Sequence, residues 1–237
     1  MKNQPDHGLE PHKGELSAQL NWLRAGVLGA NDGIVSTAGI VVGVAGATTS
    51  LNAIVTAGLA GLVAGSLSMA GGEYVSVSTQ RDTEQAAVAR ERVELETSPE
   101  QEEEELATLY QARGLSRELS RAVARELTDH DALGAHSELE LRIDPEALTS
   151  PWHAAGASLL AFAVGGILPF LAIMYPHDTL RVLVCFASVI VGLTITGFVS
   201  ARLGGAAPRP AILRNVAVGA LTMTVTWVVG KLFGVAT

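Results

Sequence analysis

The stretch Gly33–Gly72, GIVSTAGIVVGVAGATTSLNAIVTAGLAGLVAGSLSMAGG, contains no charged side chain. A membrane-spanning helix needs only about 20 predominantly apolar residues, so the stretch is too long for a single span. Small polar residues interrupt it between Gly46 and Asn52, where the sequence reads GATTSLN, and such residues are typical of a turn. The stretch therefore predicts two membrane-spanning helices joined by a short turn.

Three further uncharged runs follow at residues 154–176, 182–201 and 215–230. With the first stretch they predict five spans, approximately Trp22–Gly46, Leu51–Glu73, Trp152–Tyr175, Leu180–Leu203 and Pro210–Phe233. The expected fold class is an all-α membrane protein with five transmembrane helices. A water-soluble bundle of buried helices is the alternative, but such helices rarely lack charge over this length.

Basic residues near the span ends set the expected orientation, because cytoplasmic loops carry an excess of lysine and arginine. They gather in the N-terminal tail, in the long segment after the second span and in the loop between the fourth and fifth spans. We therefore expect these parts to be cytoplasmic and the C-terminus to lie outside. The start of the chain is polar and charged, so we expect no cleavable signal peptide.

Arginine outnumbers lysine thirteen to three, and alanine and glycine are abundant. This bias indicates a GC-rich bacterial genome, which would place a multi-pass protein in the plasma (inner) membrane. The single cysteine, Cys185, lies inside the fourth predicted span. It can form no internal disulfide and is expected to be a packing residue.

The segment 80–148 differs in composition from the rest of the chain. It holds eighteen Asp and Glu residues against eight arginines and no lysine. Such a surface is unsuited to an anionic lipid leaflet or to nucleic acid, since both require basic side chains. It suits solvent or cations. The predicted domains are a cytoplasmic tail (1–20), spans one and two (21–79), an acidic cytoplasmic helical metal-binding domain (80–148) and spans three to five (149–237).

The acidic segment has the features of a folded set of helices. Thr79–Glu96 lacks Gly and Pro and extends the second span. The sequence SPEQ at 98–101 resembles a capping box that starts a helix running to about Arg113, where Gly114 ends it. Two later helices are expected, one capped by Ser116 with Arg117, Arg121 and Arg125 along one side, and a shorter one over Asp131–Leu141.

Two pairs of carboxylates in this segment have a spacing that suits metal ligands. Glu91 and Glu94 lie three residues apart, as do Glu102 and Glu105, which puts each pair on one helix face. Like charges so placed destabilise a helix unless a cation lies between them. A solvated acidic face is the alternative. Because Pro99 separates the pairs onto two helices, the pairs can converge on a metal.

Asp32 lies directly before the first uncharged stretch. A carboxylate at the bilayer centre costs about 2.5–3.5 kcal/mol on insertion scales, and such a residue usually serves an ion or proton pathway. A hydrogen bond or salt bridge between helices is the alternative. Met69, at a similar predicted depth with Glu73 one turn below it, could complete a mixed transition-metal site or could simply pack. Small-residue faces are predicted at Gly26, Gly29, Gly33, Gly58, Gly61 and Gly65.

Other metal and enzyme motifs are incomplete. Part of a calcium loop is present at Asp129, Asp131, Gly134 and Glu140. Leu133, however, occupies a position in that loop that needs an oxygen ligand. The absence of any Glu-x-x-His argues against a ferritin-like di-iron oxidase, and the absence of a Walker loop argues against direct ATP hydrolysis. No enzymatic activity is expected.

Three features together resemble the vacuolar iron transporter family. They are ANDG at 30–33, GSLSM at 65–69 followed by GEY at 72–74, and the acidic insert. The similarity covers nearly the whole chain from about Leu20. Within the family, the chain resembles most a bacterial member that transports Fe²⁺ and Mn²⁺. The resemblance implies a five-span homodimer in the bilayer that moves Fe²⁺, and often Mn²⁺, out of the cytosol in exchange for protons.

The same resemblance implies two sets of metal ligands. Asp32 and Met69 match the membrane ligands at the dimer interface. The cytoplasmic metal-binding carboxylates match Glu91, Glu94, Glu102, Glu105 and, later in that domain, Glu138.

The chain departs from the family pattern at two places. Eukaryotic members carry a carboxylate where this chain has Gly61, and Glu73 is a candidate proton or metal relay in its place. Some members have a methionine pair where this chain has Gly134-Ala135, with His136 nearby. Because this chain lacks the soft methionine ligands, we expect Mn²⁺ to be a substrate in addition to Fe²⁺. We expect no permanently bound cofactor, only the transported metal.

The leading hypothesis is a proton-coupled Fe²⁺/Mn²⁺ exporter for iron and manganese homeostasis, whose acidic domain collects metal beneath a dimeric pore. A non-transporting membrane metal sensor or buffer would keep the glutamates without needing Asp32. A membrane structural protein whose acidic helices bind a partner protein is the third hypothesis.

Overall fold

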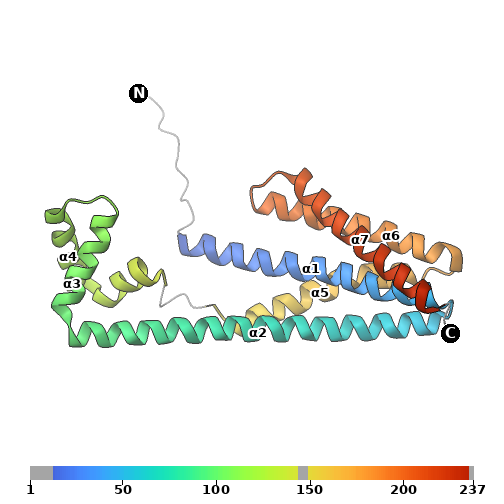
Figure 1. Cartoon of the computed structure of the whole chain (residues 1–237), viewed down its shortest axis with the longest axis horizontal. Coiled ribbons are helices and arrows are strands. Elements are labelled where there is room, and N and C mark those ends of the chain that lie inside the picture. The colour runs from blue at the N-terminus through green and yellow to red at the C-terminus, as the bar shows by residue number, and fades with distance from the viewer. Residues whose placement is uncertain (1–12, 144–148, 235–237) are drawn as a thin grey trace, which may run out of the picture. The chain divides into compact units, whose positions relative to one another are not determined.

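The computed structural model describes residues 13–143 and 149–234 of the 237-residue chain. Every regular element in these two ranges is helical, and the described residues include no strand, which confirms the predicted all-α class. The elements are α1 (Lys13–Ala47), α2 (Leu51–Thr97), α3 (Pro99–Ala112), α4 (Arg117–His136), the π-helical turn η1 (Ser137–Leu141), α5 (Pro151–Ile173), α6 (Asp178–Leu203) and α7 (Pro208–Gly234) (Figure 1).

Within residues 13–143 and 149–234, five helices are long and apolar enough to cross a membrane, as predicted. The candidate spans are Gly26–Ala47, Leu51–Thr97, Pro151–Ile173, Leu180–Leu203 and Pro208–Gly234. The turn expected after the first span lies at residues 48–50, between α1 and α2. The expected extension of the second span also occurs, since α2 continues to Thr97.

The chain forms two compact units. One, the bundle unit, comprises Met1–Val75 and Pro151–Thr237. The other, the acidic unit, comprises Ser76–Ser150. The acidic unit contains the C-terminal part of α2 together with α3, α4 and η1.

Within the bundle unit, α1 packs against α5, α6 and α7 (Figure 1). Glycines permit the close approach of α1 to α5. A β-carbon at Gly33 would collide with the backbone carbonyl of Phe162, and one at Gly165 would collide with the carbonyl of Ala30. On α2, a β-carbon at Gly65 would collide with the ring of the same Phe162. These small-residue faces therefore form helix contacts of the kind that hold membrane bundles together.

The core of the bundle unit is aliphatic and draws on five helices. Its buried members are Ile34, Ala38, Val41, Val42, Ile54, Ile173, Cys185, Val189, Leu193 and Met223. Cys185 is fully buried, as expected of a packing residue, and its sulfur lies 3.7 Å from the carbonyl oxygen of Pro169.

In the acidic unit the helices begin and end close to the predicted residues. α3 starts with Pro99 in its first turn, and Gly114, at φ +100°, follows its end. Ser98 occupies the N-cap position of α3, but its side chain makes no capping hydrogen bond because its backbone (φ −141°, ψ 49°) is not extended. The predicted capping box is wrong in that respect. Ser116 does cap α4, accepting a hydrogen bond from the backbone N–H of Leu119 at 3.3 Å.

A small apolar core holds the acidic unit together. It consists of Leu106, Ala107, Ala124 and Leu139. On its outer side, the Arg121 guanidinium donates to the Glu104 carboxylate at 2.7 and 2.9 Å, and Arg125 lies 3.4 Å from Glu103. These ion pairs are exposed and contribute little to stability. They nevertheless account for the arginine row on α4, since two of its members face carboxylates of α3.

α4 is interrupted at Asp131, where the backbone leaves the helical region (φ −158°, ψ 86°). The Asp131 carboxylate accepts a hydrogen bond from the backbone N–H of Gly134 at 3.0 Å, in the manner of an N-cap. The chain then passes through His136 into η1. The short helix predicted over 131–141 is therefore present as the last turn of α4 followed by η1.

Candidate metal centre

Three side chains from separate helices converge inside the acidic unit. Glu91 comes from α2, Glu102 from α3 and His136 from α4. Each offers one ligand atom, and these atoms all lie within 4.8 Å of one another. All three residues are buried, with 2% of Glu91, 9% of Glu102 and none of His136 exposed. Carboxylate and imidazole are both common ligands of divalent transition metals.

The Nδ1 atom of His136 is the point toward which the carboxylates converge. It lies 2.9 Å from Oε1 of Glu91, 3.5 Å from Oε2 of Glu140 and 3.9 Å from Oε2 of Glu102. Glu140 follows His136 by one helical turn, on η1, and is more exposed than the other two carboxylates. Three carboxylates thus lie 3.9 Å or less from one imidazole nitrogen.

Several polar atoms of this cluster have no hydrogen-bond partner among the described residues. They are Oε1 of Glu91 and both ring nitrogens of His136. Although Oε1 and Nδ1 are 2.9 Å apart, their mutual orientation is not that of a hydrogen bond. A buried polar group left unsatisfied costs about 1–3 kcal/mol. A cation bound between Oε1 of Glu91 and Nδ1 of His136 would remove that cost for these two atoms.

The electrostatic environment also favours a bound cation. Burial raises the pKa of the Glu91 carboxyl above its ordinary value, and Glu140, Glu102 and Glu94 raise it further, while His136 opposes the shift. Burial likewise raises the pKa of Glu102, with Glu105 as the next cause. The carboxylates therefore repel one another when charged, and a divalent ion among them would reverse that repulsion.

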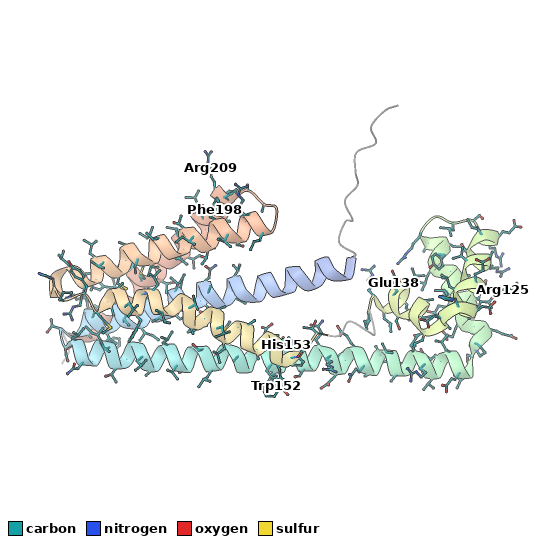
Figure 2. The ribbon with its side chains drawn as sticks, turned by 180° about the vertical axis from the view of Figure 1, so that it is seen from behind. Arg125, Glu138, Trp152, His153, Phe198 and Arg209 are labelled. Atoms are coloured by element: carbon teal, nitrogen blue, oxygen red, sulfur yellow. The ribbon has the colours of Figure 1, made fainter. Side chains whose placement is uncertain are left out.

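The other predicted ligands of the acidic unit lie at its surface. Glu94 and Glu105 are exposed, and each acts on the buried pair through its charge. Glu138, labelled in Figure 2, is exposed on η1. The structure thus brings Glu91 and Glu102 together with a histidine, while metal binding by each of the five glutamates stays a prediction.

No ligand role is predicted for His136 from the sequence. A signal for it was present, since His136 and Glu140 have the four-residue spacing that places two side chains on one helix face. That spacing alone does not reveal that Glu91 and Glu102 approach the same face.

In the bundle unit, Asp32 and its neighbour take part in two different contacts. The Ser36 hydroxyl donates to Oδ1 of Asp32 at 2.6 Å, one turn along α1. The Asn31 side-chain oxygen accepts from the Thr196 hydroxyl of α6 at 2.5 Å. Asn31 therefore joins α1 to α6, whereas Asp32, which is partly exposed, is held by its own helix.

The remaining predicted residues of the bundle lie on α2. Met69 and Glu73 are both partly buried and lie four residues apart. Gly61 is packed differently, since a β-carbon there would collide with Cδ1 of Ile40 on α1. The atoms nearest to this position all belong to the aliphatic side chain of Ile40. The roles of Met69 and Glu73 stay predictions.

Curated proteins from an amoeba and from plants are similar to the chain over most of its length. A protein of Acanthamoeba castellanii named vacuolar iron transporter is 42% identical over 224 residues, which cover 94% of this chain and 82% of that protein. Vacuolar iron transporter homolog 1 of Oryza sativa subsp. japonica is 40% identical, covering 92% of this chain and 76% of that protein. Vacuolar iron transporter homolog 2 of Arabidopsis thaliana is 34% identical, covering 93% and 88%.

These names correct the expected location. The relatives are named for the vacuole, an intracellular compartment, so the prediction of the plasma membrane is wrong. That prediction rested on the ratio of arginine to lysine, which reflects base composition and carries no targeting information. A multi-pass membrane protein remains supported.

The names are those of transporters and not of enzymes, in agreement with the expectation that the chain has no enzymatic activity. The family model described as VIT family matches residues 23–231, which include the whole acidic unit and all candidate spans apart from residues 232–234 of the last one. Together with the resemblance of the ANDG and GSLSM motifs, this match places the chain in the VIT family.

Proposed function

We propose that the chain is a proton-coupled transporter that moves Fe²⁺ and Mn²⁺ out of the cytosol. The observation that carries the proposal is the buried cluster of Glu91, Glu102 and His136, whose unpaired atoms suit a divalent metal. Membership of a family with relatives named iron transporters supports metal as the cargo. The metal is a substrate in this proposal, and no resident cofactor is required.

In the proposed mechanism, the acidic unit faces the cytosol and concentrates metal before transport. Its exposed carboxylates, among them Glu94, Glu105 and Glu138, would attract hydrated cations, because summed negative charge raises the local cation concentration. Glu91 and Glu102 would then replace part of the hydration shell. The N-terminal tail lies on the same side, and the C-terminus lies on the opposite side of the membrane.

Asp32 and Met69 are the proposed ligands of the membrane path. One carboxylate and one thioether are too few donors for a divalent ion, so a two-fold homodimer would supply a second pair. Asp32 would alternate between metal and proton, which couples the two fluxes. Glu73, one turn from Met69 on α2, is the proposed relay between the path and the cytosolic side.

Proteoliposomes with an acidic lumen test this function. Fe²⁺ kept reduced, or Mn²⁺, is added outside and metal uptake is measured together with lumenal pH. We expect uptake of both metals, alkalinisation of the lumen in proportion, and no uptake of Mg²⁺. Metal uptake that continues unchanged without a pH gradient would contradict proton coupling. Binding without any uptake would instead identify a membrane metal buffer, for which the acidic cluster alone suffices.

A further inference from the structure

We infer that His136 is a metal ligand through Nδ1 and that it biases the acidic unit toward Fe²⁺ over Mn²⁺. The inference rests on the proposed function, because it names the residue that selects among the metals collected by the acidic unit. It concerns a nitrogen donor, whereas the ligands predicted for this unit from the sequence are all carboxylates.

The first observation is the arrangement of donors around Nδ1. Carboxylate oxygens of Glu91, Glu140 and Glu102 lie 2.9, 3.5 and 3.9 Å from it. Metal–nitrogen and metal–oxygen bonds of about 2.1 Å place neighbouring donors about 3.0 Å apart in an octahedral site and about 3.4 Å apart in a tetrahedral one. Two of the three separations match these values, and the third needs a shift of about half an ångström. The distances from Nδ1 to the three carboxylates are therefore close to those between neighbouring ligands of a single ion.

The second step is the isolation of the imidazole. His136 has no exposed surface, and neither of its nitrogens has a hydrogen-bond partner among the described residues. A histidine retained only for packing would ordinarily have at least one nitrogen satisfied, since buried polar atoms are nearly always hydrogen-bonded. Nδ1 is instead aimed into a group of carboxylates.

The third step is the local backbone that presents His136. The break at Asp131 redirects α4, and the hydrogen bond from Gly134 N–H to the Asp131 carboxylate restarts the helix two residues before His136. The chain then widens into the π-helical turn that carries Glu140. Single π-turns occur frequently at functional sites. This local geometry is what brings a nitrogen and an oxygen donor from adjacent turns to one point.

The fourth step is the chemistry of selection. Carboxylate oxygens suit Mg²⁺, Ca²⁺ and Mn²⁺, whereas imidazole suits Fe²⁺, Ni²⁺, Cu²⁺ and Zn²⁺. At a given nitrogen and oxygen site, affinity rises from Mn²⁺ to Fe²⁺ along the first transition row. A centre with one imidazole and three carboxylates should therefore reject Mg²⁺ and Ca²⁺ and prefer Fe²⁺ to Mn²⁺.

The alternative is a purely structural histidine that lies among the carboxylates without binding metal.

Pulsed electron paramagnetic resonance on Mn²⁺ distinguishes these two roles. The full-length protein in detergent is loaded with less than one equivalent of Mn²⁺, and electron spin-echo modulation from directly coordinated ¹⁴N is recorded. We expect nitrogen modulation in the wild type, a changed frequency when histidine is labelled with ¹⁵N, and no such modulation in His136→Gln. His130→Gln is the matched control, since His130 is exposed on the same helix. It should retain the wild-type spectrum.

Competition between Fe²⁺ and Mn²⁺ under anaerobic conditions measures selectivity on the same samples. The affinity for Fe²⁺ should fall by about tenfold or more in His136→Gln, and by more than the affinity for Mn²⁺, so that the ratio of the two falls. It should stay unchanged in His130→Gln. Wild-type protein that binds Mn²⁺ without nitrogen modulation would overturn the inference. So would an unchanged ratio in a folded His136→Gln protein.

A wild-type spectrum without nitrogen modulation overturns the inference even if His136→Gln does not fold. The outcome is also separable from the proposed function. Nitrogen coordination without metal flux in liposomes would leave the ligand assignment standing and remove the transport function. Flux without nitrogen coordination would leave the transport function standing and remove the ligand assignment.

Discussion

The two regions of the chain that are candidates for handling metal differ in how complete their donor sets are. In the acidic unit, Glu91, Glu102 and His136 arrive from three helices and leave buried atoms unpaired. In the bundle unit, Asp32 is partly exposed and accepts a hydrogen bond from Ser36 of its own helix. One region can hold a cation with side chains of a single chain, whereas the other needs further donors. This contrast suits a site that captures metal and a second site that passes it on.

The largest effect is expected for Asp32→Asn. Asparagine keeps the shape of the side chain and can still accept from Ser36, but it carries no charge and exchanges no proton at neutral pH. The protein should fold and insert, yet lose nearly all metal flux and metal-coupled proton movement in liposomes. Metal binding by the acidic unit should persist. Wild-type flux from a folded Asp32→Asn protein would break the proposed division of roles.

Glu102→Gln tests the proposed metal-capturing cluster of Glu91, Glu102 and His136. Removing one buried carboxylate should weaken Mn²⁺ or Fe²⁺ binding to the full-length protein by about tenfold or more, as measured by calorimetry. Transport should suffer mainly at low metal concentration. The adjacent Glu103→Gln is the control, because Glu103 faces Arg125 at 3.4 Å on the outer side of the unit. Equal losses in both variants would show that the acidic surface acts only through its total charge.

The contrast between the two regions also explains what sequence reasoning could and could not reach. The spans and the helix boundaries near Pro99, Gly114 and Ser116 follow from local composition, because they depend on uncharged length and on capping residues. Asp32 can likewise be identified from the sequence, because it is a charged residue within a predicted membrane span.

The metal cluster required information that a linear pattern does not contain. Glu91 and His136 are 45 residues apart, and their approach depends on how α3 and α4 pack around Leu106 and Ala124. The sequence predicts a helix that begins at Asp131, but it does not show that the Asp131 carboxylate caps this helix at the backbone N–H of Gly134. Soft-ligand loss at Gly134-Ala135 favoured Mn²⁺ on sequence grounds, whereas the buried imidazole beside it supports the inferred preference for Fe²⁺.

A smaller effect is expected from pH on the metal-free acidic unit. The pKa of both Glu91 and Glu102 is raised above the ordinary 4.5 by burial, so the folded unit binds protons more tightly than the unfolded chain. Their contribution to stability is fully present below the unfolded pKa and is lost as the pH rises through the folded pKa. Glu104 has the opposite effect on stability, because the hydrogen bond from Arg121 lowers its pKa. Its contribution is present above the ordinary pKa of 4.5 and is lost only as the pH falls below that value.

Hydrogen exchange of the full-length protein without metal measures this effect locally. Amides of α2 and α3 near the cluster should be better protected at about pH 5 than at about pH 7, after correction for the intrinsic exchange rate. Glu91→Gln should reduce the difference, and Mn²⁺ should restore protection at the higher pH. Protection that falls on acidification from about pH 7 to about pH 5 would contradict the assigned direction of the shifts.

The smallest effect is expected for Ser36→Ala, which probes how the lone carboxylate of the bundle is held. The Ser36 hydroxyl lies 2.6 Å from Oδ1 of Asp32 and fixes the direction of the carboxylate along α1. Its removal should lower flux roughly fivefold without abolishing it, since one such hydrogen bond contributes about 1 kcal/mol net. Ser36→Thr, which keeps a hydroxyl, should restore most of the flux. Ser188→Ala is the matched control, because the Ser188 hydroxyl donates to the Cys185 carbonyl within α6 at 2.7 Å. Wild-type flux in Ser36→Ala would mean that Asp32 is oriented by donors outside its own helix, and the contrast with the self-contained acidic cluster would become sharper.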